Sequence, residues 1–457
     1  MHKIIFFVAT IIFCFQLTPS FAQYNDSLGY YWVELEGGKD STLLSYPLVF
    51  LSQSAIDRRL RQGITIEESD LPVSQEYVNQ LVDLGADIHS KSKWLNAVTI
   101  AIGKEQINKV EELNFVKSVK YVGRFIAERK YSTPSFNMTE LNEDLILPDY
   151  FHGLGTPQIR IMNADTLHDL GYKGQGIQVA VMDGGFINVD KMPFLSHLEY
   201  KHTYDFVDRV EGVFKASTHG SQVLAVMASN APNLFVGTAP LADYICLKTE
   251  DVKGEYILEE CNMIAALEYA DSLGVEVVNI SLGYSEFTDK SMDYTYEDLN
   301  GDLSLSSKSC EYAYNKGMIV VGSAGNEGNG KWKYITVPGD SKYMLTVGAT
   351  DLAGQYAGFS SIGPTTDGRI KPDLSAPGAQ IITPGVQGWR LIYGSGTSYA
   401  SPILAGAVAC LWQAFPRKTN KEIIDALIQS CNKTDDPDNF VGHGMPDFGK
   451  AFRLLEK

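Results

Sequence analysis

The chain has 457 residues, 44% of them hydrophobic, which is enough for a large core and an accessory module. Its formal net charge is −17 at pH 7, from 38 lysines and arginines against 55 aspartates and glutamates. This acidic balance argues against a nucleic acid or an anionic membrane surface as a partner and does not identify a substrate.

The first 22 residues have the three regions of a secretory signal peptide. Met1-His2-Lys3 carries positive charge, residues 4–17 are apolar, and Ser20-Phe21-Ala22 supplies small residues for a cleavage site. No other stretch approaches the ~20 apolar residues that a membrane span needs. We therefore predict a secreted or periplasmic protein without a membrane anchor in its mature form. An uncleaved N-terminal anchor is the alternative.

Five cysteines follow the predicted signal peptide, at positions 246, 261, 310, 410 and 431. An odd number cannot form a complete set of disulfides, and none of them has the Cys-x-x-Cys spacing of a metal site. Because Cys246 and Cys410 lie in strongly apolar runs, we predict buried thiols.

Residues 23–126 predict a small α+β domain of ferredoxin-like order, β-α-β-β-α-β. Its expected strands or extended segments are residues 31–35, 86–102 and 116–122, and its expected helices are residues 75–84 and 104–113. Residues 127–155 are polar, contain Pro134, Pro148 and Gly153, and lack periodicity. They predict a linker with exposed backbone.

Residues 156–457 predict one large α/β domain. Apolar runs that fit strands are residues 177–182, 244–247, 275–280, 318–321, 344–347 and 380–382, and helical patterns occupy residues 219–228, 256–273 and 306–315. Strands that are apolar nearly throughout are typical of a parallel sheet with helices on both faces. Active sites of such sheets lie at the carboxyl ends of the strands.

Four polar residues of this domain form a candidate catalytic set. Ser398 lies between a Gly-rich turn and an apolar helix, with Pro402 expected in the first turn, where a missing N–H costs nothing. Asp183 directly follows the first strand, and His219 opens a helix. A nucleophilic serine needs an imidazole to take its proton and a carboxylate to orient that imidazole. Asn326 offers an amide that can bind an oxyanion.

Each of these residues has an ordinary interpretation when taken alone. Asp183 and Asn326 fit turns, His219 fits a helix cap or a core position, and Ser398 fits a helix cap. The combination favours chemistry. The order Asp, His, Asn, Ser differs from that of α/β-hydrolases, and Ala400 excludes their Gly-x-Ser-x-Gly turn.

These segments resemble the motifs of the subtilases, the subtilisin-like serine peptidases. The resemblance covers residues 158–451 and rests, in family order, on Val179-Ala180-Val181-Met182-Asp183, Thr218-His219-Gly220, Gly325-Asn326, and Gly396-Thr397-Ser398 through Pro402. It implies an Asp183/His219/Ser398 triad that hydrolyses peptide bonds through an acyl-enzyme, with Asn326 as the oxyanion donor.

The resemblance also implies how substrate and inhibitor are held. Ser281-Leu282-Gly283 would be an exposed edge that pairs with a peptide backbone, and Ala324-Gly325 would form the other wall of the primary pocket, with Thr336 at its base. Residues 23–126 resemble the family's inhibitory propeptide, so we expect a zymogen whose partners are peptide substrates and its own N-terminal domain, and a monomer.

Other features depart from the family pattern. An insertion at residues 43–71 contains Arg58-Arg59-Leu60-Arg61, which we interpret as a solvated helix face, with a processing site as the alternative. Tyr399 stands where methionine is common, which predicts a changed pocket shape. Residues 229–233 and the loop Asp298–Asp302 lack a clear ligand set for calcium, so we expect no metal or cofactor.

Two alternatives to an exported endopeptidase stay open. The chain could be a protease-shaped binding protein whose cleft is permanently occluded by its N-terminal domain, or a hydrolase of small esters or amides. Labelling of Ser398 by a fluorophosphonate would distinguish the first alternative, and comparison of peptide and ester turnover would distinguish the second.

Overall fold

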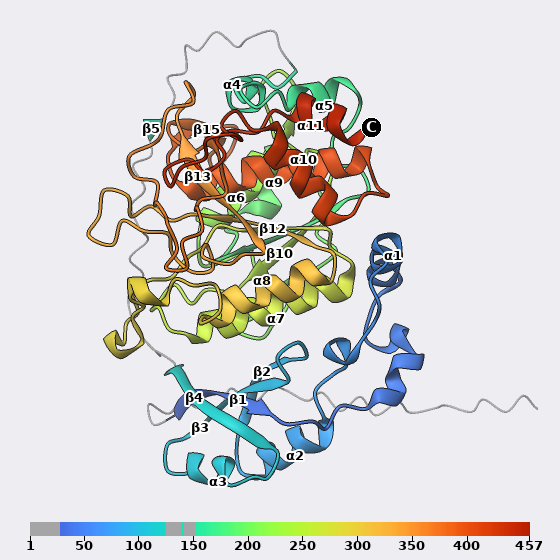
Figure 1. Ribbon diagram of the computed structural model, residues 1–457, viewed down its shortest axis with the longest axis vertical. Helices are drawn as coiled ribbons and strands as arrows, with labels where there is room; N and C mark the ends of the chain where they lie inside the picture. The colour runs from blue at the N-terminus through green and yellow to red at the C-terminus, as the bar shows by residue number, and fades with distance from the viewer. Residues whose placement is uncertain (1–27, 125–138, 141–150) are drawn as a thin grey trace, which may run out of the picture.

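The computed structural model describes residues 28–124, 139–140 and 151–457 (Figure 1). The predicted signal peptide and most of the predicted linker lie outside these ranges. Residues 28–124 form an N-terminal domain, coloured blue to cyan, and residues 151–457 form a larger domain above it in the view. Within the described ranges, no helix is long and apolar enough to cross a membrane.

The N-terminal domain is a four-stranded antiparallel sheet of order β2-β3-β1-β4, as its sequence pattern predicts. One face of the sheet packs against two helices, and the other, including Trp32 and Ala101, packs against the larger domain. The elements are β1 (Leu28–Leu35), α2 (Gln75–Asp83), β2 (Asp87–Ser92), β3 (Ala97–Gly103), α3 (Ile107–Glu111) and β4 (Val116–Arg124).

The larger domain is built on a seven-stranded parallel sheet of order β14-β13-β12-β11-β6-β10-β7. Its central strands are buried throughout, which explains their unbroken apolar patterns. The strands are β6 (Gln178–Asp183), β7 (Thr203–Asp205), β10 (Asp243–Lys248), β11 (Val277–Ile280), β12 (Ile319–Ser323), β13 (Met344–Thr350) and β14 (Leu374–Pro377).

Helices cover both faces of this sheet, as predicted. Alternate residues of β6 separate the two layers: Val179 and Val181 pack with α6 (His219–Ala228) and α9 (Thr397–Ala414), whereas Ala180 and Met182 pack with α7 (Leu258–Leu273) and α8 (Leu305–Asn315). Four further helices lie outside this framework, namely α4 (Thr156–Arg160), α5 (Asp165–Asp169), α10 (Asn420–Ser430) and α11 (Phe448–Leu455).

Helix α9 is buried from Thr397 to Trp412, as its apolar sequence predicts. Pro402, however, does not lie in the first turn. The helix begins at Thr397, so Pro402 removes the N–H that would bond to the carbonyl of Ser398. The hydroxyl of Ser281 donates to that carbonyl instead, at 3.0 Å.

The last predicted strand of the parallel sheet is wrong. Residues 381–384 form β15, which pairs antiparallel with β16 (Leu391–Gly394), and the edge of the parallel sheet is β14. The sequence of β14, Leu374-Ser375-Ala376-Pro377, is short and only weakly apolar. Its burial comes from the tertiary structure, so a hydropathy pattern does not reveal it.

Two parts of the predicted linker have a defined partner in the larger domain. Strand β5 (Thr139–Glu140) pairs antiparallel with β16. Residues 151–155 lie beside the hairpin of β8 (Asn230–Ala231) and β9 (Phe235–Val236), where the Leu154 N–H donates to Leu234 O at 2.9 Å. Such short backbone pairings need no apolar side-chain pattern, so the sequence carries no sign of them.

All five cysteines of the described chain are buried free thiols, as predicted. The inserted segment 43–71, which we call the arm, differs from its prediction. Its helix α1 (Gln53–Gln62) presents Arg58 and Arg59 to the larger domain, where they are 0% and 1% exposed, rather than to solvent. Leu60 faces solvent at 70% exposure, whereas Arg61, 41% exposed, lies 3.1 Å from Glu276 of the larger domain.

Candidate active site

Asp183 and His219 are brought together by the end of β6 and the start of α6. Asp183 is 1% exposed, and its Oδ1 accepts a hydrogen bond from the Gly184 N–H at 2.7 Å. Its Oδ2 lies 2.8 Å from Nδ1 of His219. Gly220 allows this approach, because a Cβ there would lie 2.4 Å from the carbonyl oxygen of Gly185 and 2.8 Å from the Cβ of Asp183.

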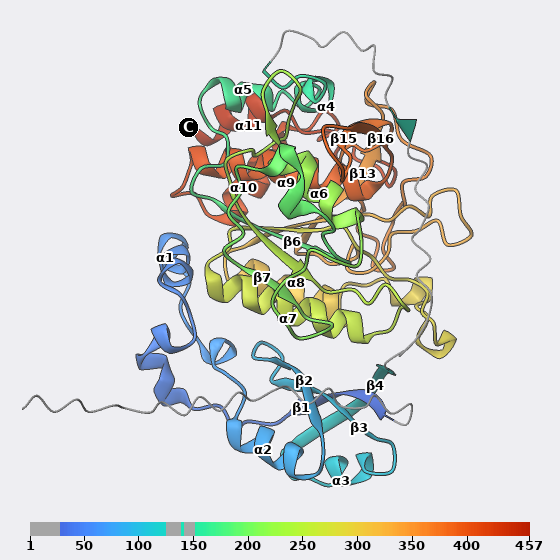
Figure 2. The ribbon, with the colours of Figure 1, turned by 180° about the vertical axis from the view of Figure 1, so that it is seen from behind.

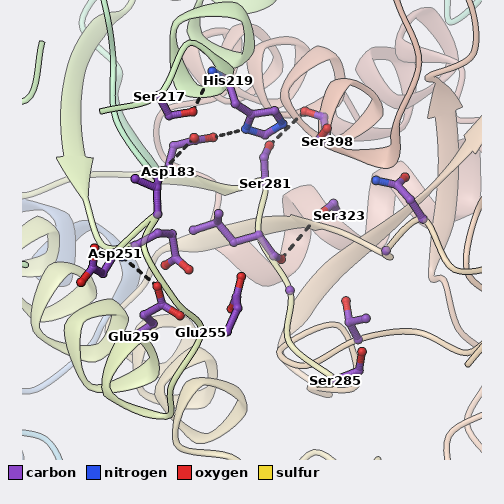
Figure 3. A pocket seen from close by; sticks show the side chains of 18 of the residues that line it. Asp183, Ser217, His219, Asp251, Glu255, Glu259, Ser281, Ser285, Ser323 and Ser398 are labelled. Atoms are coloured by element: carbon purple, nitrogen blue, oxygen red, sulfur yellow. Dashed lines mark hydrogen bonds and ion pairs between the residues drawn. The ribbon is translucent and has the colours of Figure 1, made fainter. Parts of the chain in front are cut away.

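The electrostatics of this pair suit a general base. Burial disfavours the imidazolium of His219, but the charge and the hydrogen bond of Asp183 outweigh it, so the pKa of His219 is raised from its ordinary value. Figure 3 shows the ring of His219 between Asp183 and Ser398. Nδ1 is bonded to the carboxylate, and Nε2 is the ring nitrogen on the serine side, where it can exchange a proton.

Ser398 is the second residue of α9, at the start of this buried helix. Its Oγ is buried and has no hydrogen-bond partner among the described residues. Gly396 leaves room beside it, because a Cβ at Gly396 would lie 2.9 Å from this Oγ and 3.7 Å from Nδ2 of Asn326. The space next to Ser398 therefore also borders the Asn326 amide.

The Asn326 side chain is oriented by Thr397. Its Oδ1 accepts from the backbone N–H and the hydroxyl of Thr397 at 2.8 and 3.0 Å, which leaves Nδ2 directed toward Gly396. The backbone N–H of Ser398 is a second donor, since the first N–H groups of a helix have no intrahelical acceptor. An amide and a helix-end N–H next to a nucleophile are the donors that an oxyanion needs.

The predicted edge Ser281-Leu282-Gly283 follows β11 and lines a cleft of about 530 Å³ that contains Asp183, His219 and Ser398. The Ser281 hydroxyl donates to the carbonyl of Ser398 at 3.0 Å. It joins a buried network in which Asn279 Nδ2 donates to Ser281 Oγ at 2.9 Å and Ser401 Oγ donates to Asn279 Oδ1 at 3.0 Å. The sequence analysis missed Asn279 and Ser401, because only the fold brings them together.

Gly325 and Thr336 also line the cleft. A Cβ at Gly283 would lie 2.1 Å from Thr336 Oγ1, and one at Gly325 would lie 3.0 Å from it, so this side chain fills the space between the two glycines. Ala324 differs from expectation. It is fully buried, its N–H donates to Val347 O, and the cleft lining includes its neighbour Ser323 instead.

Tyr399 does not change the shape of the cleft. Its ring is 0% exposed, lies 6.3 Å from the ring of His219, and donates its hydroxyl to Gln222 Oε1 at 2.7 Å. Gly394 accommodates it, because a Cβ there would come within 2.8 Å of the ring. The predicted effect on pocket shape is therefore wrong: the larger side chain is placed in the core.

Three glutamates that sequence reasoning missed line the far end of the cleft. Carboxylate oxygens of Glu250, Glu255 and Glu259 lie within 4.8 Å of one another, and Figure 3 shows the latter two below Asp183. Burial, followed by the charge of Glu255, raises the pKa of Glu250 to about 8, and burial also raises those of Glu255 and Glu259. Their closeness within ten residues of sequence was the available signal.

Neither segment that we weighed for calcium gathers free carboxylates. Residues 230–231 form β8, and the Ser229 carbonyl accepts from Gly237 N–H at 2.8 Å. In the loop 298–302, Asp298 Oδ2 accepts from the Thr295 N–H at 2.7 Å, and Asp302 Oδ2 lies 3.6 Å from Lys342 Nζ. The carboxylates of Glu250, Glu255 and Glu259, by contrast, lie close enough together to share a cation. The absence of a metal stays a prediction.

The sequence matches two family models. Residues 174–444, more than half of the chain, match the model described as the subtilase family, peptidase S8. Residues 30–136 match the peptidase S8 propeptide domain of Bacteroidota, which covers the N-terminal domain, including the arm.

Individual relatives agree with these matches. The chain is 29% identical over 385 residues to the thermophilic serine proteinase of Bacillus sp. (strain AK1), covering 78% of this chain and 87% of that protein. It is 28% identical over 350 residues to subtilisin NAT of Bacillus subtilis subsp. natto, covering 75% and 77%. It is 28% identical over 304 residues to the membrane-bound transcription factor site-1 protease of Rattus norvegicus, covering 64% and 26%. The chain therefore belongs to the subtilase family, as a subtilisin-like serine protease with an N-terminal propeptide domain.

Proposed function

We propose that this protein is an exported serine endopeptidase that uses Asp183, His219 and Ser398 as a catalytic triad and is made as a zymogen. The observation that carries the proposal is the 2.8 Å contact between Asp183 Oδ2 and His219 Nδ1, beside a serine hydroxyl that has no hydrogen-bond partner among the described residues. The pattern of residues 1–22 supports export.

The chemistry follows from the positions of these groups. As the Ser398 hydroxyl attacks the substrate carbonyl, Nε2 of His219 takes its proton and Asp183 stabilises the resulting imidazolium. Asn326 Nδ2 and the Ser398 N–H bind the oxyanion. Collapse of the intermediate expels the amine, which receives the proton from His219, and leaves an acyl-enzyme. A water molecule activated by the same imidazole then hydrolyses the ester.

The cleft suits an extended peptide with a small residue before the scissile bond. The Ser281–Gly283 edge offers backbone groups along one wall of the cleft, which is how sheets take up extended peptides. Thr336 occupies the space between Gly283 and Gly325, where a large side chain of the substrate would otherwise enter. We therefore propose that small or medium side chains are preferred at this position.

Two contacts support the delivery of the linker to this cleft. At the end of β4, Arg124 Nε donates to the Tyr256 hydroxyl at 3.3 Å, and Tyr256 is adjacent to Glu255, which lines the cleft. The chain is next described at β5, paired with β16 two residues before Gly396. We propose that the chain cuts itself between residues 127 and 155.

A fluorophosphonate probe tests the enzyme directly. Wild-type protein, with its linker cut, should be labelled at Ser398, and the variant Ser398→Ala should not. The variant His219→Ala should be labelled far more slowly, because the nucleophile loses its base. Failure of the wild type to react, together with slow turnover of peptides, would favour the occluded binding protein. Rapid turnover of esters without turnover of peptides would favour a small-molecule hydrolase.

A further inference from the structure

The arm contacts the larger domain at a place far from the candidate active site. Figure 1 and Figure 2 both show α1 apart from the sheet of the N-terminal domain and beside the ends of α7 and α8. These helices lead into β11 and β12, so the arm lies at the amino ends of the strands. Asp183 and Asn326 follow the carboxyl ends, at the opposite edge.

Arg58 is the centre of this contact. Its guanidinium is 0% exposed and donates to the carbonyls of Val275, Asp271 and Lys316, the last two at 3.4 and 3.2 Å. These carbonyls belong to the last turn of α7 and to the residues that follow α7 and α8, at helix ends that carry a partial negative charge. One arginine of the arm thus caps two helices of the larger domain.

Arg59 and Asp271 form the second part of the contact. Arg59 Nη2 lies 2.9 Å from both carboxylate oxygens of Asp271 and 2.8 Å from Asp70 of the arm itself. Asp271 is also paired with Arg58 and, at 3.2 Å, with Lys93. Burial would raise the pKa of Asp271, but these three cations hold it well below its usual range. The carboxylate therefore stays charged across the working range of pH.

The larger domain also contributes a lysine and backbone groups to the contact with the arm. Lys316 Nζ, 1% exposed, donates to Glu67, Ser69 and Asp70 at 2.8, 2.6 and 3.0 Å. Gln62 spans the two parts, donating to Gly317 O at 2.8 Å and accepting from Asn420 N–H at 2.9 Å. Opposite charges are thus paired across a buried interface, in which Arg59 Nε has no hydrogen-bond partner among the described residues.

We propose that the arm is a second anchor of the N-terminal domain, which keeps this domain bound after the linker is cut and works independently of the active-site cleft. The anchor gains its strength from burial, because breaking one partner of a buried ion pair leaves an unpaired charge without water. Its surface on the larger domain, formed by Asp271, Lys316 and the ends of α7 and α8, is a docking site for a helix with two adjacent arginines. This proposal rests on the proposed zymogen only in assuming that the linker is cut.

The test measures how fast the N-terminal domain leaves after the linker is cut. In the Ser398→Ala background, the recognition sequence of a site-specific protease replaces residues 131–136, so the cut does not depend on the chain's own activity. The cut complex is diluted, and dissociation is followed by size exclusion. The variants Arg58→Gln and Arg59→Gln are compared with Arg61→Gln, the same change on the same helix. Arg61 is 41% exposed and pairs with Glu276 at 3.1 Å, so this control removes a partly exposed ion pair across the same interface.

The expected result is release on the order of 10²-fold faster in Arg58→Gln and Arg59→Gln, against less than about fivefold in Arg61→Gln. Asp271→Asn in the larger domain should speed release as much as Arg59→Gln does. The double variant should speed release by less than the product of the two single accelerations. Equal release rates for wild type, Arg58→Gln and Arg59→Gln would overturn the proposal. So would equal acceleration by Arg61→Gln.

A milder variant covers the case in which an arginine variant does not fold. Gln62→Ala removes the hydrogen bonds to Gly317 and Asn420 without leaving a charge unpaired, and it should speed release by about five- to tenfold. A rate unchanged from wild type in this variant would count against the anchor. Because no step needs a working nucleophile, failure of the proposed peptidase activity leaves the outcome readable.

Discussion

The hydroxyl of Ser281 donates to the backbone carbonyl of Ser398 at 3.0 Å and so replaces the helical N–H that Pro402 lacks. Asn279 fixes this hydroxyl by donating to it at 2.9 Å. The residue that carries the proposed nucleophile is therefore tied to the strand β11, which continues into the proposed substrate edge. Pro402, in the second turn of α9, thus leaves a carbonyl at Ser398 that accepts a hydrogen bond from Ser281, at the end of β11.

The first prediction concerns this contact. Ser281→Ala leaves the Ser398 carbonyl and the Asn279 amide buried without this partner, which should lower the free energy of unfolding by about 1–3 kcal/mol. Ser285→Ala, which removes a half-buried hydroxyl at the cleft wall, is the matched control and should change it little. Urea unfolding in the Ser398→Ala background measures both. Equal stability of the two variants would show that the Ser281 hydrogen bond makes no net contribution to the free energy of unfolding.

The second prediction concerns the oxyanion. Asn326→Ala should lower kcat by on the order of 10²–10³ with little change in KM, because its amide binds the oxyanion more strongly than the ground-state carbonyl. Thr397→Val removes a hydroxyl that orients this amide at 3.0 Å but leaves the backbone bond at 2.8 Å, so its loss should be smaller. Steady-state kinetics on a peptide substrate check both. An unchanged kcat in Asn326→Ala would mean that another group binds the oxyanion.

The third prediction concerns the primary pocket. Thr336→Gly should widen the accepted side chains toward Phe and Tyr, because Thr336 fills the space between Gly283 and Gly325. Thr336→Val keeps the volume and removes the buried hydroxyl, which has no described partner, so its preference should stay narrow. Profiling on a peptide library decides the matter. Best cleavage after Phe or Tyr by the wild type would contradict the assignment.

The sequence could predict the site residues that lie in local motifs, but not those that are far apart in the chain and meet only in the fold. Asp183, His219, Asn326 and Ser398 each lie in a local motif at the end of a strand or the start of a helix, so local patterns locate them. The network of Asn279, Ser281 and Ser401 could not be predicted, because its members are ordinary polar residues whose proximity depends on the packing of α9 on β11.

The errors in the fold have the same cause. Arg58 and Arg59 have the composition of a solvated helix face, and only the ends of α7 and α8, more than 200 residues away, make them buried. Strand β14 is hidden because its sequence is barely apolar, whereas the apolar β15 lies in a different sheet. Hydropathy reports how apolar a segment is and does not report which partner covers it.

The fourth prediction is a dependence of stability on pH. The pKa of Glu250, about 8 in the folded protein, lies above the ordinary value of a glutamate, so the folded state binds this proton more tightly than the unfolded state. The resulting stability is fully present below the ordinary pKa and is lost as the pH rises through about 8. Glu250→Gln keeps an acceptor for the Tyr284 hydroxyl and removes the titration.

Thermal unfolding between about pH 5 and 9 measures this effect. The Tm of the Ser398→Ala protein should fall with pH, and Glu250→Gln should fall less steeply. Glu286→Gln, at an exposed carboxylate paired with Lys290 at 2.9 Å, is the control and should follow the parent protein. A slope in Glu250→Gln as steep as in the parent would assign the dependence to another group.

The last prediction is that the active site releases the N-terminal domain by cutting within residues 127–155. The variant Ser398→Ala keeps the fold and lacks the nucleophile, so it should accumulate as a chain that has lost only its signal peptide. Ser395→Ala is the matched control, because this hydroxyl accepts from Gln380 N–H at 2.9 Å and stands outside the triad. It should mature like the wild type.

Intact-mass measurement of the three exported proteins, purified without other proteases, gives both the site and the agent of the cut. The N-terminal domain ends at Arg124, which contacts Tyr256 near one end of the cleft, and the chain is next described at β5, which pairs with β16. The cut should therefore fall between Arg124 and β5. Wild type and Ser395→Ala should then yield the same two masses. Maturation of Ser398→Ala to that same product would show that a different protease makes the cut.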